Sequence, residues 1–320
     1  MNARETASEG QVLVTGVSGF VGARLFGRLN TGRNESAFGW SRRPPKRFPG
    51  LWAAMDLAEL SGRGAGVSRL EAALDRLKPV GIYHLAAQAN PRECAAHPGP
   101  AERINVQASE ALFEAAARHG IPVVFASSAA VYRSAPEPHR EQETTEPGSP
   151  YGLMKRQAER AAEHATRELG GRVVVARAFN HSGPGQSTEY ALSAFAHRLA
   201  AARSGTGPIE VGNLAAVRDF LHVDDVLDAY QVLLERGAGG TAYNVCSGVG
   251  VAMGELFERL GARFGFSAAD LAQRTRPADS GGRAVEADVL IGDPGKLREL
   301  GWRPKRSLDE LLDAVARPLL

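Results

Sequence analysis

Three residues of the sequence could together reduce a carbonyl group. Ser128 follows the apolar run at residues 123–126, and Tyr151 and Lys155 are four residues apart, so both project from one face of a helix. A free tyrosine titrates at about 10, and the ammonium of Lys155 would favour its phenolate. A serine hydroxyl aimed at the same oxygen would orient the carbonyl and stabilise a developing alkoxide. The catalytic candidates are therefore Ser128, Tyr151 and Lys155.

Residues 11–22, QVLVTGVSGFVG, predict where a cofactor binds. Residues 11–14 have strand character, glycines follow, and a helical pattern begins at Phe20. A dinucleotide pyrophosphate must approach backbone N–H groups at a helix N-terminus, and a Cβ there would hold it off. An ordinary strand–helix turn is the alternative. The predicted dinucleotide contacts are Gly16, Ser18, Gly19, Phe20, Val21 and Gly22.

The residues after the second predicted strand, 36–40, favour NADP(H) over NAD(H). An acidic residue about 20 positions beyond the glycines would bind the adenosine ribose, but Ser41, Arg42 and Arg43 stand there, at the start of a surface loop over 42–49. Guanidinium donors match the oxygens of a 2′-phosphate, although a solvated basic loop has the same composition. NAD(H) stays possible. Asp56 and Leu57 are predicted beside the adenine, with a surface aspartate as the alternative.

The alternation of strands and helices predicts an α/β fold with a doubly wound parallel sheet of Rossmann type. Further strands are predicted at 80–85, 121–126 and 173–178, and helices at 70–77, 101–119 and 151–169. Ala86 and Ala87 follow the strand at 80–85, and small residues at that strand end allow phosphates and ribose to approach closely.

Composition excludes several classes of function. The chain has 320 residues, 43% of them hydrophobic, and 38 basic against 36 acidic residues give no general field that would gather nucleic acid or an anionic membrane. Cys94 and Cys246 lack neighbours at metal-binding spacing and are interpreted as packing residues in a reducing compartment. No segment predicts a secretion signal or a membrane span, and we expect a cytoplasmic protein without a metal site.

The motifs together resemble the extended short-chain dehydrogenase/reductase family, in family order across the whole chain. The matching segments are TGVSGFVG, HLAAQ at 84–88, Asn105, SSAAVY, YGLMK and the strand end at Asn180. The resemblance implies Ser128, Tyr151 and Lys155 as the catalytic trio, with Lys155 also bonding the nicotinamide ribose, whose positive ring would further favour phenolate. The cofactor contacts that it adds are Leu85, Gln88, Asn105, Tyr151 and Lys155.

The second half resembles the GDP-sugar members of that family, namely GDP-4-dehydro-6-deoxy-D-mannose reductases and the related GDP-mannose 4,6-dehydratases. The matching segments are 180–187, 210–230 and 243–248. The resemblance implies that Asn180 and Arg218 touch the substrate diphosphate, for which a guanidinium fork is suited. An ion pair of Arg218 with Asp219 or Asp224 is the alternative. The expected substrate contacts are Gln88, Ser128, Asn180, Val211, Asn213, Arg218 and Arg276.

Two alanines argue against elimination chemistry. A 4,6-dehydratase must abstract the C5 proton and protonate the departing C6 hydroxyl, so it needs carboxyl groups beside the serine, where this chain has Ala129 and Ala130. We predict hydride transfer from NADPH to the 4-keto carbon of a GDP-linked, or other NDP-linked, 6-deoxy-4-keto sugar, with the proton from Tyr151. The alternatives are an NDP-sugar 4- or 3,5-epimerase with a retained cofactor and, with less support, a 4,6-dehydratase or a non-enzymatic NADP(H)-binding protein.

The predicted cofactor domain comprises residues 8–179 and 220–248, and a smaller nucleotide-sugar domain comprises 180–219 and 249–320, with the substrate between them. As the resemblance implies, helices 101–119 and 151–169 could pair in a homodimer, although they could equally only cover the sheet.

Several polar residues are assigned structural places or mark departures from the family. His181 is expected to be structural, and Asp224 and Asp225 to begin a helix, whose N-terminus favours negative charge. Arg133 departs from the family, which usually has glycine there. Residues 276–279 resemble its nucleotide-contacting turn, and an apparent insertion follows at 280–287.

Overall fold

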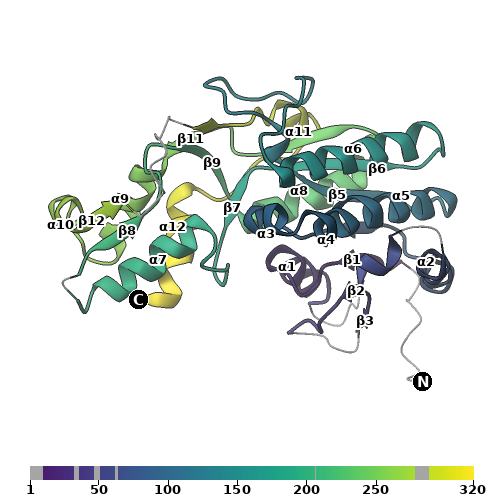
Figure 1. Ribbon diagram of the computed structural model, residues 1–320, viewed down its shortest axis with the longest axis horizontal. Coiled ribbons are helices and arrows are strands. Elements are labelled where there is room, and N and C mark those ends of the chain that lie inside the picture. The colour runs from purple at the N-terminus through teal and green to yellow at the C-terminus, as the bar shows by residue number, and fades with distance from the viewer. Residues whose placement is uncertain (1–9, 32–35, 47–50, 62–63, 206, 278–287) are drawn as a thin grey trace.

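A parallel sheet of seven strands forms the centre of the larger part of the molecule (Figure 1). The computed structural model describes residues 10–31, 36–46, 51–61, 64–205, 207–277 and 288–320. In the order in which they lie, the strands are β10 (Ala242–Val245), β6 (Val173–Ala178), β5 (Val123–Ser128), β4 (Ile82–His84), β1 (Val12–Thr15), β2 (Ala37–Ser41) and β3 (Trp52–Ala54). The chain builds outward from β1 to β3 and then, in the other direction, from β4 to β10. This is the doubly wound Rossmann arrangement, so the fold prediction is confirmed.

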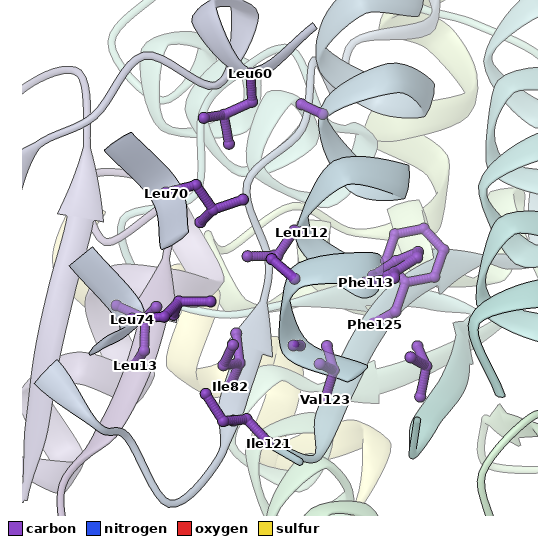
Figure 2. Packing of buried hydrophobic residues seen from close by; sticks show 14 of the residues in the cluster. Leu13, Leu60, Leu70, Leu74, Ile82, Leu112, Phe113, Ile121, Val123 and Phe125 are labelled. Atoms are coloured by element: carbon purple, nitrogen blue, oxygen red, sulfur yellow. The ribbon is translucent and has the colours of Figure 1, made fainter. Parts of the chain in front are cut away.

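Both faces of this sheet are buried under helices. Adjacent residues such as Val123 and Val124 point to opposite faces and belong to different core clusters, as expected for parallel strands that are apolar on both sides. One face packs against α2 (Ala65–Leu77), α5 (Ala108–Arg118) and α6 (Pro150–Arg167), and Figure 2 shows part of that cluster around Leu74, Ile82 and Phe113. The opposite face packs against α1 (Phe20–Leu29) and α8 (Val223–Arg236).

A smaller unit with its own core lies at the left of Figure 1. Phe195 and Phe257 meet edge to face in this core, with ring centroids 5.1 Å apart. Its helices are α7 (Ala191–Ala202), α9 (Met253–Arg263), α10 (Ala268–Arg274) and α12 (Leu308–Ala316). Strand β8 (Ile209–Val211) pairs with β12 (Thr275–Pro277). A further small sheet comprises β7 (Asn180–Ser182), β9 (Val217–His222), β11 (Gly250–Ala252) and β13 (Val289–Leu290).

The crossings between the two units differ in detail from the predicted ranges. Residues 220–222 lie in β9, and the return to the larger unit begins with α8. Leu297 of α11 (Gly295–Glu299) and Trp302 share the core cluster of α8, although the range predicted for the smaller domain includes them. The indole of Trp302 donates to the carbonyl oxygen of Asp225 (3.1 Å). We therefore propose that residues 292–306 belong to the larger unit.

The helix predicted over 101–119 is interrupted. After α3 (Pro91–Ala96), α4 (Pro98–Glu102) continues into a π-helical turn, η3 (Arg103–Gln107), and α5 begins only at Ala108. Such a turn holds an extra residue and rotates the side chains beyond it. Asn105 lies within this turn and is 1% exposed. The remaining short turns are η2 (Leu57–Leu60), η4 (Ala129–Val131) and η5 (Arg317–Leu319).

Over the ranges that the structure describes, no helix is both long and apolar enough to cross a bilayer.

Some predicted features lie outside the described residues. These are the insertion at 280–287, positions 278–279 of the nucleotide turn, and positions 47–49 of the surface loop.

Candidate active site

The glycine loop between β1 and α1 forms a cradle for an anion. Gly16 has φ +77°, which disfavours other residues, and a Cβ at Gly22 would lie 2.1 Å from the carbonyl oxygen of Gly16. Gly19 caps α1 without a side-chain hydrogen bond, and the first turn holds no acidic residue, so its N–H groups and dipole are open to phosphate oxygens. Ser18, Phe20 and Val21 surround this turn at partly or fully exposed positions. These residues therefore fit a dinucleotide pyrophosphate.

The predicted adenosine-side residues lie on two neighbouring strand ends. Ser41 at the end of β2 is in register with Ala54 of β3, so the segment after β2 adjoins the segment after β3. Ser41 is buried and donates to the carbonyl oxygen of Arg43, while the Arg42 and Arg43 side chains are exposed. This is a position from which two guanidinium groups can meet a 2′-phosphate.

Asp56 and Leu57 have structural partners on the next segment. Asp56 caps η2 by accepting from the amide of Ala58 (3.0 Å), and Leu57 is buried in the core. Any contact of Asp56 with an adenine would therefore come from a carboxylate that already accepts one hydrogen bond.

The loop 85–88 after β4 is held by a buried chain of polar groups. The Thr15 hydroxyl accepts from the amides of Leu85 and Ala86 (3.1 Å each) and contacts His84 Nδ1 (2.9 Å), and His84 Nε2 contacts the hydroxyl of Ser109 (3.0 Å). Burial, followed by the charge of Lys155, lowers the pKa of His84 to about 3, so the ring is neutral. Sequence reasoning missed Thr15, although a polar residue ending an apolar strand could have indicated it.

Asn105 completes this support. Its amide accepts from the main-chain N–H of Gln88 (2.8 Å) and donates to the carbonyl oxygen of Gln88 (3.0 Å). The side chain predicted to contact the cofactor thus binds the loop that carries Ala86, Ala87 and Gln88. The thiol of Cys94 donates to the same carbonyl oxygen (3.2 Å).

The structure brings Ser128, Tyr151 and Lys155 together where β5 ends against the first turns of α6. The Ser128 hydroxyl lies close enough to the Tyr151 phenol to lower the pKa of that phenol, and Lys155 donates from Nζ to the carbonyl oxygen of Ala126 (2.7 Å). Ser149 caps α6, and its hydroxyl accepts from the amide of Gly152 (3.1 Å). The three residues predicted from their spacing therefore lie together at the end of β5.

Gly152 sets how closely α6 approaches the serine loop. A Cβ at this position would lie 2.1 Å from the carbonyl oxygen of Ala130 in η4. A larger residue would push the helix and its tyrosine away from the end of β5, because the atom it would meet belongs to the backbone and cannot turn aside. Close packing of α6 on η4 therefore requires glycine at position 152.

Burial determines the protonation states of Tyr151 and Lys155. Burial is the largest cause acting on Tyr151 and raises the pKa of its phenol above the ordinary value, and the hydrogen bond from Ser128 opposes this only in part. Burial lowers the pKa of Lys155 to about 8. At neutral pH the site therefore holds a neutral phenol and an ammonium, which is the protonated state that a proton donor needs.

Two predicted substrate residues lie on the β8–β12 ribbon of the smaller unit, and a third lies just beyond β8. Val211 pairs in register with Pro277 and is buried, whereas the adjacent Arg276 is exposed. Arg276 donates to the carbonyl oxygens of Gln273 (2.8 Å) and Thr275 (2.7 Å). Asn213, beyond β8, accepts from the amide of Ala215 (2.9 Å).

Asn180 and Arg218 lie on the neighbouring strands β7 and β9, where Asn180 is in register with Phe220. Arg218 forms its ion pair with Asp288 and also donates to the carbonyl oxygen of that residue (2.6 Å). The alternative prediction, an ion pair of Arg218 with Asp219 or Asp224, was wrong. Asp219 is fully buried and accepts from Ser247, Gly248 and Gly292, and Asp224 lies beside His222 and Arg306.

The remaining residues singled out from the sequence make contacts within the protein. His181 contacts the carbonyl oxygen of Phe179 through Nδ1 (3.0 Å), and burial lowers its pKa, so the ring is neutral. Asp224 and Asp225 stand in the first turn of α8, which confirms that prediction. Arg133 is exposed and pairs with Glu146 (3.1 Å). In the described portion of the chain, no three His, Cys, Asp or Glu side chains cluster as metal ligands would.

Comparison with known proteins agrees with this geometry. Residues 12–246 match the model of the NAD dependent epimerase/dehydratase family. GDP-6-deoxy-D-mannose reductase of Pseudomonas aeruginosa is 32% identical, covering 95% of each chain, and UDP-glucose 4-epimerase of Azospirillum brasilense is 29% identical, covering 99% of this chain and 92% of the relative. The solved structure of RMD from Pseudomonas aeruginosa complexed with NADPH superposes with a TM-score of 0.76 at 28% identity, covering 97% and 98%.

Proposed function

The chain belongs to the NAD dependent epimerase/dehydratase family, and from this premise we propose that it reduces the 4-keto group of a GDP-4-keto-6-deoxyhexose with NADPH. One observation carries the proposal. The Ser128 hydroxyl acts on the Tyr151 phenol at the end of β5, Lys155 lies beside both, and Ala129 and Ala130 stand next to the serine. The chain thus has the groups for protonating an alkoxide and lacks carboxyl groups there for elimination.

Each residue of the trio has one role in the reduction. Ser128 hydrogen-bonds the keto oxygen and orients it, and Tyr151, held as a phenol by burial, donates its proton to that oxygen as charge develops. The ammonium of Lys155, 5.8 Å from the centroid of the Tyr151 ring, stabilises the phenolate that remains until solvent returns the proton. NADPH, when bound at the glycine loop, supplies the hydride to C4.

Substrate residues are assigned in the same proposal. Arg218 and Asn180 would hold the diphosphate, because a guanidinium fork donates to two phosphate oxygens at once. Arg218 would then exchange its exposed partner Asp288, which has a side chain 49% exposed, for the phosphate. Val211, Asn213 and Arg276 would contact the nucleotide from the β8–β12 ribbon.

The deciding experiment measures NADPH oxidation by the purified protein with freshly made GDP-4-keto-6-deoxymannose, with NADH in parallel. Stoichiometric loss of NADPH and formation of a GDP-6-deoxyhexose are expected. Loss of neither cofactor would reject this substrate.

A 4-epimerase is the second candidate, because one relative carries that activity. It would retain its cofactor through purification and interconvert the C4 epimers of an NDP-sugar with no net change in the nicotinamide.

We further propose that the protein is a homodimer paired through α5 and α6. Leu153, on α6, is 52% exposed, which is unusual for a leucine in a helix that otherwise covers a sheet. Sedimentation would show a dimer, and Leu153→Glu would shift it towards monomer.

A further inference from the structure

Glu159 continues the stripe of α6 that carries the catalytic tyrosine and lysine. It follows Lys155 by four residues, so it lies one turn further along the same face. Lys155 binds the carbonyl oxygen of Ala126 (2.7 Å), and Glu159 Oε1 accepts from the hydroxyl of the next residue, Ser127 (2.6 Å). Two consecutive residues of β5 thus bind two residues that are one helical turn apart on α6, and the next residue, Ser128, lies beside Tyr151 one turn earlier.

A buried arginine fixes the Glu159 carboxylate from the other side. Arg177 of β6 donates from Nε to Oε1 (3.0 Å) and from Nη2 to Oε2 (2.8 Å). Both side chains are buried, with Glu159 1% and Arg177 4% exposed. Ser127 and Arg177 are in register across β5 and β6. The carboxylate therefore accepts three hydrogen bonds from two strands, and its geometry is fixed by all of them.

Arg177 is itself held from the far side. Its Nη1 donates to the hydroxyl of Tyr132 (2.7 Å) and to the carbonyl oxygen of Glu141 (3.2 Å). The Tyr132 hydroxyl in turn donates to Asn244 Oδ1 on β10 (2.8 Å). The arginine thus has no freedom to turn away from Glu159, because its other donors are bound to the loop after η4.

The titratable groups around Lys155 differ in charge. Tyr151 and Glu159 lie on α6 with the lysine, Cys94 comes from α3, and His84 comes from β4. Burial raises the pKa values of Tyr151 and Cys94, so both are neutral at pH 7, and the lowered pKa of His84 makes that ring neutral as well. Among the described residues that act on Lys155, Glu159 is the one that carries a negative charge at neutral pH.

We propose that Glu159, locked by Arg177 and Ser127, is a positioning residue that holds Lys155 against the end of β5 and supplies the counter-charge for its ammonium. The catalytic importance of Glu159 rests on the proposed function, because the role of Lys155 in catalysis is part of that function. The arrangement itself is independent of which sugar the protein reduces.

The test is a direct titration of Lys155 by NMR. The sequence contains five lysines, Lys46, Lys78, Lys155, Lys296 and Lys305, so [13Cε]lysine labelling gives few signals, and the Lys155 signal is the one missing in Lys155→Met. Glu159→Gln keeps an acceptor for Ser127 and removes the charge. We expect the Lys155 midpoint to fall by about one pH unit or more, because opposite charges one helical turn apart interact strongly when buried.

Glu163→Gln is the matched control. Glu163 lies one further turn along α6, its side chain is 34% exposed, and it pairs with Arg156 (2.8 Å), whose guanidinium also lies 3.7 Å from Glu159 Oε2. Glu163→Gln therefore removes a charge beside the same arginine and leaves the Glu159 carboxylate in place. The same neutralisation there should leave the Lys155 midpoint unchanged.

A double variant keeps the test decisive if the unpaired arginine prevents folding. Glu159→Gln with Arg177→Met replaces the buried pair by neutral residues of similar size, which proteins tolerate far better than a single buried charge. Its midpoint should fall as well. A folded single or double variant with the wild-type midpoint would overturn the proposal. The expected shift in a protein that does not turn over the keto sugar would instead reject the proposed function and leave the positioning role standing.

Discussion

Alanine at position 22 is expected to weaken NADPH binding, whereas alanine at position 27 in the same helix is expected to stabilise the protein. A Cβ at Gly22 would lie 2.1 Å from the carbonyl oxygen and 2.7 Å from the carbonyl carbon of Gly16, both backbone atoms. Van der Waals contact needs a further 1 Å or so. The glycine loop must therefore move away from α1, and with it the N–H groups that would hold the pyrophosphate.

The expected change in the free energy of unfolding has opposite signs for Gly22→Ala and Gly27→Ala. Replacing glycine by alanine inside a helix gains about 1 kcal/mol, and a Cβ at Gly27 meets nothing within 4 Å, so Gly27→Ala should keep that gain. Forced overpacking costs about 1–3 kcal/mol, which outweighs the gain at Gly22. If a similar amount is lost in cofactor binding, the Kd for NADPH rises about tenfold for each 1.4 kcal/mol.

Two measurements on each variant check this reasoning. Chemical denaturation gives the free energy of unfolding, and fluorescence titration gives the Kd for NADPH. Gly27→Ala should bind NADPH like the wild type and unfold at higher denaturant. Wild-type NADPH affinity in a folded Gly22→Ala protein would refute the view that this glycine is there to let the loop approach the helix.

Three further predictions concern the cofactor and the trio. Tyr151→Phe should lower kcat by about 10²–10⁴-fold through loss of the proton donor, a far larger effect than on the Kd for NADPH in a binding titration; wild-type kcat would contradict the proton-donor role. Replacing both Arg42 and Arg43 by serine should weaken binding of NADPH about tenfold or more and leave NADH unaffected, because only the former carries a 2′-phosphate; equal losses for both would contradict the assignment. Burial lowers the pKa of Lys155 to about 8, below the unfolded value of about 10.4, so its contribution to stability is present above pH 10.4 and is lost as the pH falls through 8. The free energy of unfolding of the wild type minus that of Lys155→Met should rise by up to about 3 kcal/mol from pH 8 to 10.4, and a flat difference would contradict the burial of this charge.

The sequence predicted those parts of the fold that depend on local pattern. The strand at 173–178 and the helix beginning at Phe20 were located correctly, since each has a clear apolar period bounded by turn residues. The interruption around Asn105 was not predicted, because a single π-helical turn leaves the apolar spacing on either side looking like one helix.

Contacts between distant residues had no sequence signal. Nothing in the spacing joins Arg218 to Asp288, 70 residues away, or Glu159 of α6 to Arg177 of β6, 18 residues away. The sequence predicted Tyr151 as the proton donor, but it could not show that burial raises the pKa of this phenol, since the motif reveals the neighbouring lysine and not the extent of burial. Pairing partners and desolvation are properties of the folded chain, and pattern alone does not reveal them.

The position of β10 in the chain constrains how the protein can be synthesised and folded. This strand completes the edge of the sheet beside β6, yet residues 180–222, which form part of the smaller unit, separate the two in sequence. A nascent chain that ends before Ala242 would leave β6 as an open parallel edge, which invites pairing with other chains. Such long-range closure raises contact order and slows folding. The two units are therefore expected to mature together, and neither could be excised or exchanged as an independent module.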